Sequence, residues 1–286
     1  MKNQKTIKSL LFAFAFFAFS VPLFAQTGAS LLKKTTYKTD SIEFGPGGTI
    51  SVTGAPKGSI SIESWNKPEI EVSAEVEIQA PTEADLALLA AVNTFVIDQG
   101  FNHTRIISVG TFDKDYMKQN AKKFPKALMG MPFKVDFKIK VPRYCDLNIT
   151  GGDGDFSLSG VDGEVFVKYL NSNAKINMIG GSLQATFGGG SVDLTIPTRS
   201  WRGRFADVQL ATGSMSVQLP LSFNAEVEAA VLRTGQIENT FAELKPKAKN
   251  VQFTEKSISA KAGIGGVPLK FTVGDGSLKI SEVGKQ

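Results

Sequence analysis

The chain has very little of the residue types that make disulfides, histidine-based metal sites and histidine-based catalysis. Its 286 residues include one cysteine and one histidine. A single cysteine excludes a disulfide within the chain, so an exported fold of this sequence must be held together by burial and hydrogen bonding alone. Any catalytic triad would have to use His103, and a metal site built on it would need other kinds of ligand.

The surroundings of these two single residues do not indicate chemistry. His103 ends the turn-like stretch 100–103, where a solvated side chain is the simpler interpretation and a catalytic or metal-binding role is the alternative. Cys145 lies between Tyr144 and Asp146 at the start of an apolar strand. That position is typical of a structural cysteine rather than of a reactive thiol.

No apolar run in the chain is as long as a membrane-spanning helix requires. The longest is about 15 residues, against the roughly 20 needed to cross a bilayer. It follows three lysines near the N-terminus and precedes a break that ends in a small residue at Ala25. This order is typical of a secretory signal, so we predict that residues 1–25 are a signal peptide cleaved near Ala25. A retained membrane anchor is the alternative.

Export determines how the charge of the chain is interpreted. The predicted signal peptide contains three lysines and no acidic residue, so its removal lowers the formal net charge from +5 to +2. A nucleic-acid partner therefore loses its main support. We expect a mature protein with no transmembrane segment, located in the periplasm, at the cell surface or outside the cell.

A short phrase recurs down the chain, in which Gly or Asn is followed by a small residue and then by alternating apolar and polar residues. Its members are spaced by about 20 residues between Phe156 and Ile237, which is the length of one coil in solenoid proteins. A second set lies out of phase between the first, so each coil would carry about two short strands. The first set begins at Gly154, Asn173, Gly190, Gly213 and Gly235, and the second at Gly163, Gly181, Arg204 and Asn224.

Strands this closely spaced leave no room for crossover helices. A parallel sheet built from βαβ units is thereby excluded, and a coil of strands is the economical arrangement. Gly and Asn at the corners supply the positive φ that each bend needs. We therefore predict an all-β fold, a single-stranded β-helix or β-solenoid, over residues 42–282. The apolar positions expected to face inward are Leu147, Ile149, Phe156, Leu158, Val165, Val167, Ile176, Met178, Leu183, Val192, Leu194, Phe205, Val208, Leu210, Met215, Val217, Val227 and Ile237.

The N-terminal part already shows the alternation of the repeat block. Residues 26–41 are polar, rich in Lys and Thr and without periodicity, which predicts a flexible spacer. Strands with one buried face are expected at 48–52, 58–62 and 69–78, because polar and apolar residues alternate there with a period of two. Near the C-terminus, residues 274–280 repeat the phrase once more, which predicts a final rung or cap.

An insertion at about 81–132 interrupts this pattern. Thr82 and Asp85 form an N-cap pair that opens a short helix, and the β-branched run at 94–97 should end it. A return strand is expected at 104–109. Residues 113–126 contain five lysines among Tyr and apolar residues; solvated surface lysines are the simpler interpretation, and an interaction loop is the alternative.

Taken together, these phrases resemble a known bacterial family, the putative auto-transporter adhesins with a head GIN-like domain, which are also described as β-strand-repeat proteins of unknown function. The resemblance rests on Gly-Thr-Ile-Ser-Val at 48–52, on the phrase at 58–65, on Val-Pro at 141–142 leading into 146–149, and on the stacked phrases up to 241. It covers most of residues 45–282. It implies an exported, non-catalytic β-solenoid, and it supplies no functional residues to transfer.

Two clusters of charged residues are candidate sites of chemistry. Asp193 and Asp207, with Arg199, Arg202 and Arg204 between them, could converge on one face as in a polysaccharide lyase or hydrolase; a surface corner with paired charges is the favoured interpretation. The Gly-Gly-Asp-Gly-Asp phrase at 151–155 is similar to calcium-binding repeats of some β-helices, but it occurs only once.

We therefore assign no catalytic, cofactor-binding or metal-binding residue and no cofactor, and we do not expect an enzyme. The expected function is that of an exported envelope or cell-surface protein, an adhesin or interaction scaffold with an unidentified protein or glycan as its partner. A polysaccharide-binding or polysaccharide-degrading β-helix protein is the alternative.

Overall fold

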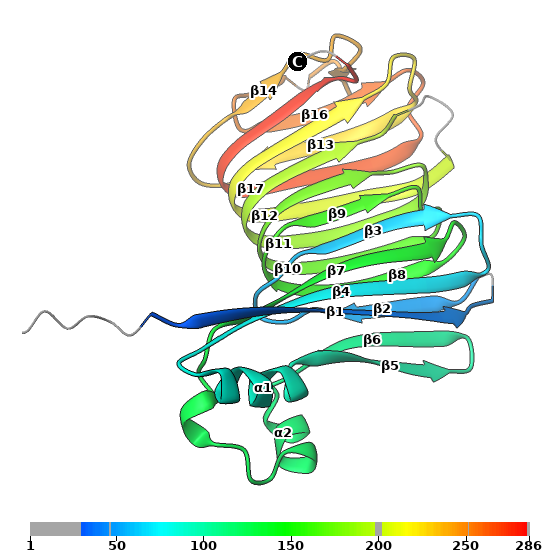
Figure 1. Cartoon of the computed structure of the whole chain (residues 1–286). Helices are drawn as coiled ribbons and strands as arrows, with labels where there is room; N and C mark the ends of the chain where they lie inside the picture. The colour runs from blue at the N-terminus through cyan, green and yellow to red at the C-terminus, as the bar shows by residue number, and fades with distance from the viewer. Residues whose placement is uncertain (1–29, 46, 198–201, 251, 285–286) are drawn as a thin grey trace, which may run out of the picture. The chain divides into compact units, whose positions relative to one another are not determined.

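The computed structural model describes residues 30–45, 47–197, 202–250 and 252–284. The predicted signal peptide at 1–25 lies outside these residues. Within them the chain is mostly β: seventeen strands form one large sheet, accompanied by two α-helices (Figure 1). The all-β class is thus confirmed.

Four long strands organise the sheet, and each of them changes direction once. In β10 (Glu164–Asn177) the buried positions are odd-numbered up to Tyr169 and even-numbered from Ser172 onward. A pleated strand buries alternate residues, so this change of phase marks a bend. The first halves of the long strands belong to what we call the first arm of the sheet, and the second halves to the second arm. The other three long strands are β11 (Gly180–Thr195), β12 (Arg202–Leu219) and β17 (Val267–Glu282).

Each arm continues on both sides of the long strands with shorter ones. In the first arm, β5, β6, β2 and β8 lie on one side and β13, β16 and β15 on the other. In the second arm, β1, β4, β7, β3 and β9 lie on one side and β14 on the other. The bounds are β1 Leu32–Glu43, β2 Thr49–Thr53, β3 Ile60–Trp65, β4 Glu69–Ala80, β5 Thr94–Gly100, β6 His103–Val109, β7 Phe133–Pro142, β8 Asp146–Asp153, β9 Phe156–Ser159, β13 Ala225–Val231, β14 Ile237–Asn239, β15 Lys245–Pro246 and β16 Ser257–Ala262.

The long strands pair in parallel and in register. Val165 of β10 lies between Leu147 of β8 and Leu183 of β11, each 18 positions away. The prediction for residues 274–280 was wrong, however. β17 is not a final rung or cap, because it pairs with β12 on one side and with β13 and β14 on the other. The C-terminal strand is therefore an interior strand of the sheet.

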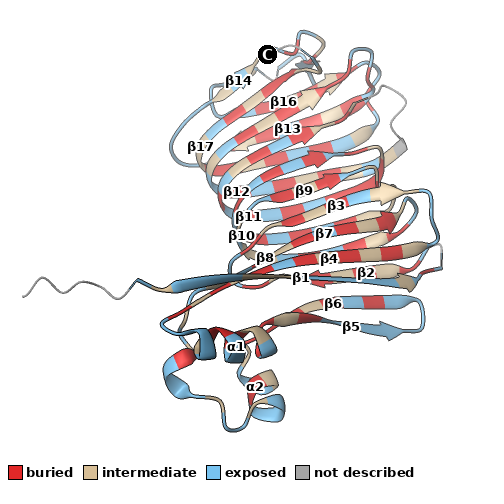
Figure 2. Ribbon diagram, in the orientation of Figure 1, coloured by how far each residue is buried: buried red, intermediate tan, exposed pale blue. Residues whose placement is uncertain are grey.

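One hydrophobic core lies between the two arms. Phe156 of the second arm packs against Tyr169 of the first with ring centroids 5.4 Å apart, and Phe95 of β5 meets Phe137 of β7 edge to face at 5.7 Å. Figure 2 shows the resulting alternation of buried and exposed residues along the strands. Burial of these apolar side chains, without any disulfide, is the main stabilising contribution.

The expected core positions are buried, with two exceptions. Phe205 is only half-buried, because it is an odd-numbered position in a part of β12 whose buried positions are even-numbered. The inward phase of β12 then falls on Ala206, Val208 and Leu210. Ile237, in the short outer strand β14, is also only half-buried, since among the described residues β14 pairs with β17 alone.

The bends between the arms are made by stacked glycines. Gly190, Gly213 and Gly276 occupy equivalent register positions in β11, β12 and β17 and have φ of 110°, 136° and 136°. A Cβ atom at Gly213 would lie 1.8 Å from the carbonyl oxygen of Gly190. Only glycine can both adopt this φ and allow the neighbouring strand to approach so closely.

The N-terminal segment differs from the expected spacer. Residues 32–41 lie within β1, which pairs antiparallel with β4 along its full length. This strand lies at the edge of the sheet and is mostly exposed, so it carries few apolar residues from which the sequence could reveal it. The limits predicted for the domain stay a prediction.

The insertion contains the expected helix. α1 (Glu83–Val92) begins at Thr82, whose side chain accepts a hydrogen bond from the Asp85 backbone N–H, and it buries Leu86 and Leu89. β6 is the predicted return strand, and it pairs antiparallel with β5. The lysine-rich segment adds a second short helix, α2 (Lys114–Asn120), and a 3-10 turn at Lys126–Leu128.

Candidate interaction surfaces

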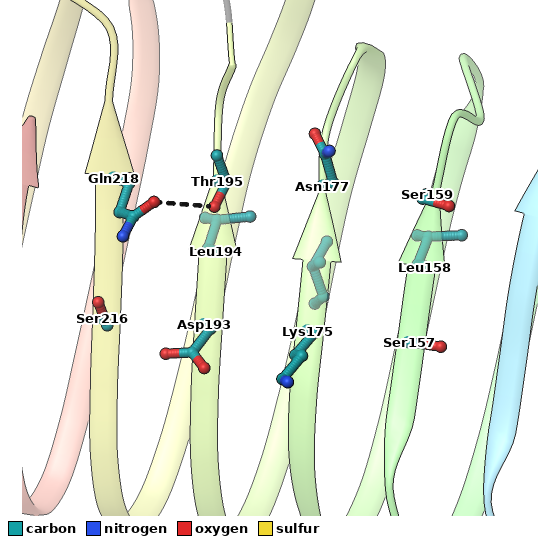
Figure 3. A pocket seen from close by; sticks show the side chains of 11 residues that line it. Ser157, Leu158, Ser159, Lys175, Asn177, Asp193, Leu194, Thr195, Ser216 and Gln218 are labelled. Carbon is teal, nitrogen blue, oxygen red and sulfur yellow. Dashed lines mark hydrogen bonds between the residues drawn. The ribbon is translucent and has the colours of Figure 1, made fainter. Parts of the chain in front are cut away.

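The outward face of the second arm carries regular rows of short polar side chains across neighbouring strands. Its central part forms a groove of about 490 Å³ over β9, β10, β11 and β12, shown in Figure 3. We call this surface the second-arm face. Its first row consists of Ser157, Lys175, Asp193 and Ser216, and its second row of Ser159, Asn177, Thr195 and Gln218.

Strand alternation explains why these residues face outward together. Leu158, Ile176 and Leu194 are the positions between the two rows, and all three are buried. Because the strands are parallel and in register, each outward residue falls beside its equivalent on the next strand, at the spacing of about 4.8 Å between strands. Thr195 uses this proximity to donate a hydrogen bond to the Gln218 side chain (3.4 Å), drawn as a dashed line in Figure 3.

Several charged side chains on the second arm each form an ion pair with one residue of opposite charge. Lys140 Nζ lies 2.9 Å from Glu71 Oε1, and this hydrogen bond raises the pKa of Lys140. Burial of the Asp136 carboxyl opposes its ionisation, but hydrogen bonds from Lys134 and Ser59 lower its pKa overall. Isolated ion pairs of this kind indicate a solvated polar surface rather than a catalytic cluster.

The structure does not bring together the carboxylates considered for catalysis. Asp193 faces outward from the second arm, whereas Asp207 belongs to the first arm, where it accepts a hydrogen bond from Gln209 (3.2 Å) and lies 3.8 Å from Lys270 Nζ. Arg204 pairs with Glu164 at 3.0 Å. Arg199 and the side chain of Arg202 lie outside what the structure describes. The two aspartates, whose convergence was the less favoured interpretation of the sequence, therefore lie on different arms.

The Gly-Asp phrase at 151–155 has a structural role. Asp153 accepts a hydrogen bond from Asn171 (2.6 Å), and Asp155 accepts one from Asn173 (3.1 Å) on the adjacent strand. Both carboxylates thus bridge neighbouring strands near the bend. Within residues 30–45, 47–197, 202–250 and 252–284, no group of three or more His, Cys, Asp and Glu side chains is arranged to hold a metal ion.

The single histidine and the single cysteine are placed as expected from the sequence. His103 is exposed at the start of β6, with its Nε2 2.8 Å from the Ser51 hydroxyl. Cys145 is buried, and its thiol lies 3.1 Å from the Pro142 carbonyl oxygen. Burial, with a smaller contribution from Asp146, raises the pKa of Cys145 to about 12, so the thiolate is disfavoured.

The lysine-rich insertion forms a second candidate surface, the insertion groove, with a volume of about 450 Å³. Its floor consists of the buried Met117 and the half-buried Phe124, and its rim carries lysines. Within the described part of the chain these lysines have no ion pair or hydrogen bond through their ammonium groups. The rim lysines are Lys114, Lys118, Lys122 and Lys126.

A third candidate surface, which the sequence did not predict, lies where β3 and β7 end. Trp65 is the last residue of β3 and Tyr144 lies in the loop after β7; they are 79 positions apart in the chain, and they line one pocket beside Arg143. Because β3 and β7 pair with each other, the sheet register brings these two residues together. The available signal was the presence of aromatic and basic residues beside prolines at two predicted turns.

In the part of the chain that the structure describes, no helix is both long and apolar enough to span a membrane. Comparison with known proteins identifies no matching family model and no matching curated protein.

Solved structures resemble the chain only distantly. One is described as a putative cell adhesion protein from Clostridium sporogenes; it has 12% sequence identity and a TM-score of 0.46, over 87% of this chain and 100% of that one. Another is described as a putative adhesin from Bacteroides fragilis, with 12% identity and a TM-score of 0.35 over 86% and 97%. A protein from Parabacteroides distasonis described as a putative lipid binding protein has 12% identity and a TM-score of 0.28 over 85% and 96%. Similarity at this level carries no argument about function.

Proposed function

We propose that this protein is an exported, non-catalytic interaction scaffold of the bacterial cell envelope or cell surface, an adhesin in the broad sense. In this proposal the stacked, bent strands form a β-solenoid whose second-arm face binds an extended partner. The parallel, in-register pairing of the four long strands supports the solenoid. The adhesin family with a head GIN-like domain remains part of the proposal, on the motifs that resemble it.

One observation carries the functional proposal: the second-arm face repeats the same outward register positions across many strands. Its first row passes directly from Ser157 of β9 to Lys175 of β10 and on to Asp193, and Ser61 of β3 extends the row beyond Ser157. An extended partner could make similar contacts at each strand, so weak polar contacts would add up along the surface.

The chemistry of the second row favours a glycan over a protein as the partner. Ser159, Asn177 and Thr195 offer hydroxyl and amide groups, which both donate and accept hydrogen bonds, as sugar hydroxyls do. A polysaccharide-binding protein is therefore the second candidate. Polysaccharide degradation has less support, because Asp193 and Asp207 face outward from different arms.

Export is tested first and separately. We expect N-terminal sequencing of the protein recovered from the envelope or extracellular fraction to begin near Gln26. Recovery of an intact N-terminus at Met1 in the membrane fraction would contradict the export step while leaving the binding surfaces untested by that experiment.

Binding is tested with two matched double variants on a glycan array and on immobilised envelope polysaccharide. Lys175→Ala with Asp193→Ala alters the second-arm face, and Lys168→Ala with Gln209→Ala alters outward positions of the first arm. We expect the first pair to weaken binding by about tenfold or more, because it removes two polar contacts, and the second pair to leave it unchanged. Equal loss in both pairs would contradict the assignment of the second-arm face.

The insertion groove is tested in the same assay. Lys118→Glu with Lys122→Glu reverses two rim charges on exposed positions and should leave the fold intact. If this variant alone loses binding, the partner is anionic and the insertion, rather than the second-arm face, is the interaction surface.

A further inference from the structure

A small pocket with aromatic and cationic walls lies between two loops at one end of the second arm. One wall comes from Trp65, the last residue of β3, and from Asn66 in the loop that follows it; the other comes from Arg143 and Tyr144 in the loop after β7. The pocket has a volume of about 430 Å³, which lies within the range of small-ligand sites, about 300–1,000 Å³. We call it the Trp65 pocket. It lies at the end of β3, beyond the two rows of the second-arm face and with no lining residue in common with its groove, and it does not depend on the function proposed for that face.

The backbone around the Trp65 pocket is held by hydrogen bonds. The Trp65 indole N–H donates to the Glu69 carbonyl oxygen at 2.8 Å, which fixes the ring. The Phe44 N–H donates to the Pro68 carbonyl oxygen at 3.0 Å, and the Gly47 N–H donates to the Tyr144 carbonyl oxygen at 3.1 Å. These contacts join three segments of the chain, so little ordering is needed when a ligand binds.

The aromatic rings differ in how much surface they leave free. Tyr144 is 58% exposed, which is a large fraction for an aromatic residue beside a pocket. Trp65 is half-buried, and the ammonium group of Lys67 lies 4.5 Å from the centre of its ring. Tyr144 therefore offers the open aromatic surface, and Trp65 forms a fixed wall. An aromatic face can stack on the C–H face of a pyranose ring.

The charges beside the pocket leave one cation without an acidic partner. Lys67 pairs with Glu69 at 3.1 Å, and Lys140 pairs with Glu71 at 2.9 Å. Arg143 is exposed, its guanidinium carbon lies 5.5 Å from the centre of the Tyr144 ring, and it has no carboxylate partner among the described residues. A guanidinium in this situation can donate two parallel hydrogen bonds to a carboxylate.

From these observations we propose that the Trp65 pocket binds an acidic sugar residue, a uronic acid within a polysaccharide. The sugar ring stacks on Tyr144, its carboxylate accepts hydrogen bonds from the Arg143 guanidinium, and the Asn66 side chain hydrogen bonds to its hydroxyls. A neutral sugar would leave the Arg143 charge unused, and a simple inorganic anion would leave the exposed Tyr144 ring unused. The combination therefore favours a ligand that is both a pyranose and an anion.

The test is isothermal titration calorimetry of the full protein with tetrasaccharides of galacturonate, glucuronate and mannuronate, each compared with a neutral tetrasaccharide of similar linkage. We expect at least one uronate to bind and its neutral counterpart to bind about tenfold or more weakly, because the charge-assisted hydrogen bonds to Arg143 are lost. Binding should also quench or shift the fluorescence of Trp65 and weaken as salt concentration rises.

Variants separate this pocket from the rest of the molecule. Arg143→Gln should lose the preference for uronate over neutral sugar, and Tyr144→Ala should weaken binding of both. Tyr37→Ala, which removes a 76% exposed tyrosine on β1, and Arg204→Gln are the matched controls and should behave as the unmodified protein.

Failure of all three uronates to bind would overturn the proposal, as would equal binding of the uronate and the neutral sugar. A second outcome is that uronate binding survives Arg143→Gln but is lost in the variant carrying Lys175→Ala with Asp193→Ala. That outcome would overturn the assignment of the uronate site to the Trp65 pocket and support the second-arm face. Loss through both sets of variants would place one polysaccharide across both sites and support both proposals.

Discussion

Replacing Gly213 by alanine should destabilise the protein far more than an ordinary surface substitution. Gly213 lies in the stack of glycines where β11, β12 and β17 bend between the arms, and its φ is 136°. An L-residue in this conformation costs about 1–3 kcal/mol in backbone strain. The added Cβ would also lie 1.8 Å from the Gly190 carbonyl oxygen, a backbone atom that cannot move without shifting β11. We expect a combined loss of about 3 kcal/mol or more from the free energy of unfolding.

The assay is equilibrium urea denaturation of the purified protein, followed by circular dichroism. The matched control is Gly130→Ala, because a Cβ at Gly130 meets no atom within 4 Å and its φ is not positive. That change should be neutral or stabilising by up to about 1 kcal/mol, since it restricts the unfolded chain. Equal stability of the two variants would refute the role of the stacked glycines at the bends.

Three further expectations follow from the core, one ion pair and the cysteine. Ile176→Asp should cost about 4 kcal/mol or more, because it buries a charge between the arms, whereas Lys175→Asp should be tolerated at its exposed position; the two midpoints of urea denaturation decide this. Hydrogen bonds from Arg233 lower the pKa of Asp275 from 3.8 to about 2. The stability that Asp275 contributes is therefore present above its unfolded pKa and is lost as pH falls through about 2. The difference in free energy of unfolding between the protein and Asp275→Asn should shrink as pH falls from 3.8 to about 2. Cys145 should react with a thiol reagent at mildly alkaline pH only after unfolding, because burial raises its pKa to about 12; rapid reaction of the native protein would contradict its buried position.

Local features of the sequence predicted local features of the fold. The N-cap formed by Thr82 and Asp85 and the helix behind it could be predicted because capping depends on residues three positions apart. The buried positions of β10 and β11 could be predicted because alternation fixes which side chains face inward once a strand exists. Phe205 was predicted wrongly because it is out of phase with Val208 and Leu210, and the same alternation places Ala206 inward instead.

The order of the strands could not be predicted from the same information. The phrases in β12, β14 and β17 are similar, so any of them could pair with any other, and the local pattern does not say that β17 lies between the other two. The edge strand β1 was missed because polar residues on an exposed edge look like a spacer. The Trp65 pocket was missed because its two loops meet only through the pairing of β3 with β7.

The central claim is that this protein binds without catalysing a reaction, and turnover is the most direct test of it. The purified protein is incubated with a panel of neutral and acidic polysaccharides, and the reaction is analysed by chromatography for newly released oligosaccharides, with binding measured on the same panel. We expect retention of at least one polysaccharide and no new products over prolonged incubation. Release of oligosaccharides that is abolished by Asp207→Asn, with the fold intact, would contradict it and establish an enzyme.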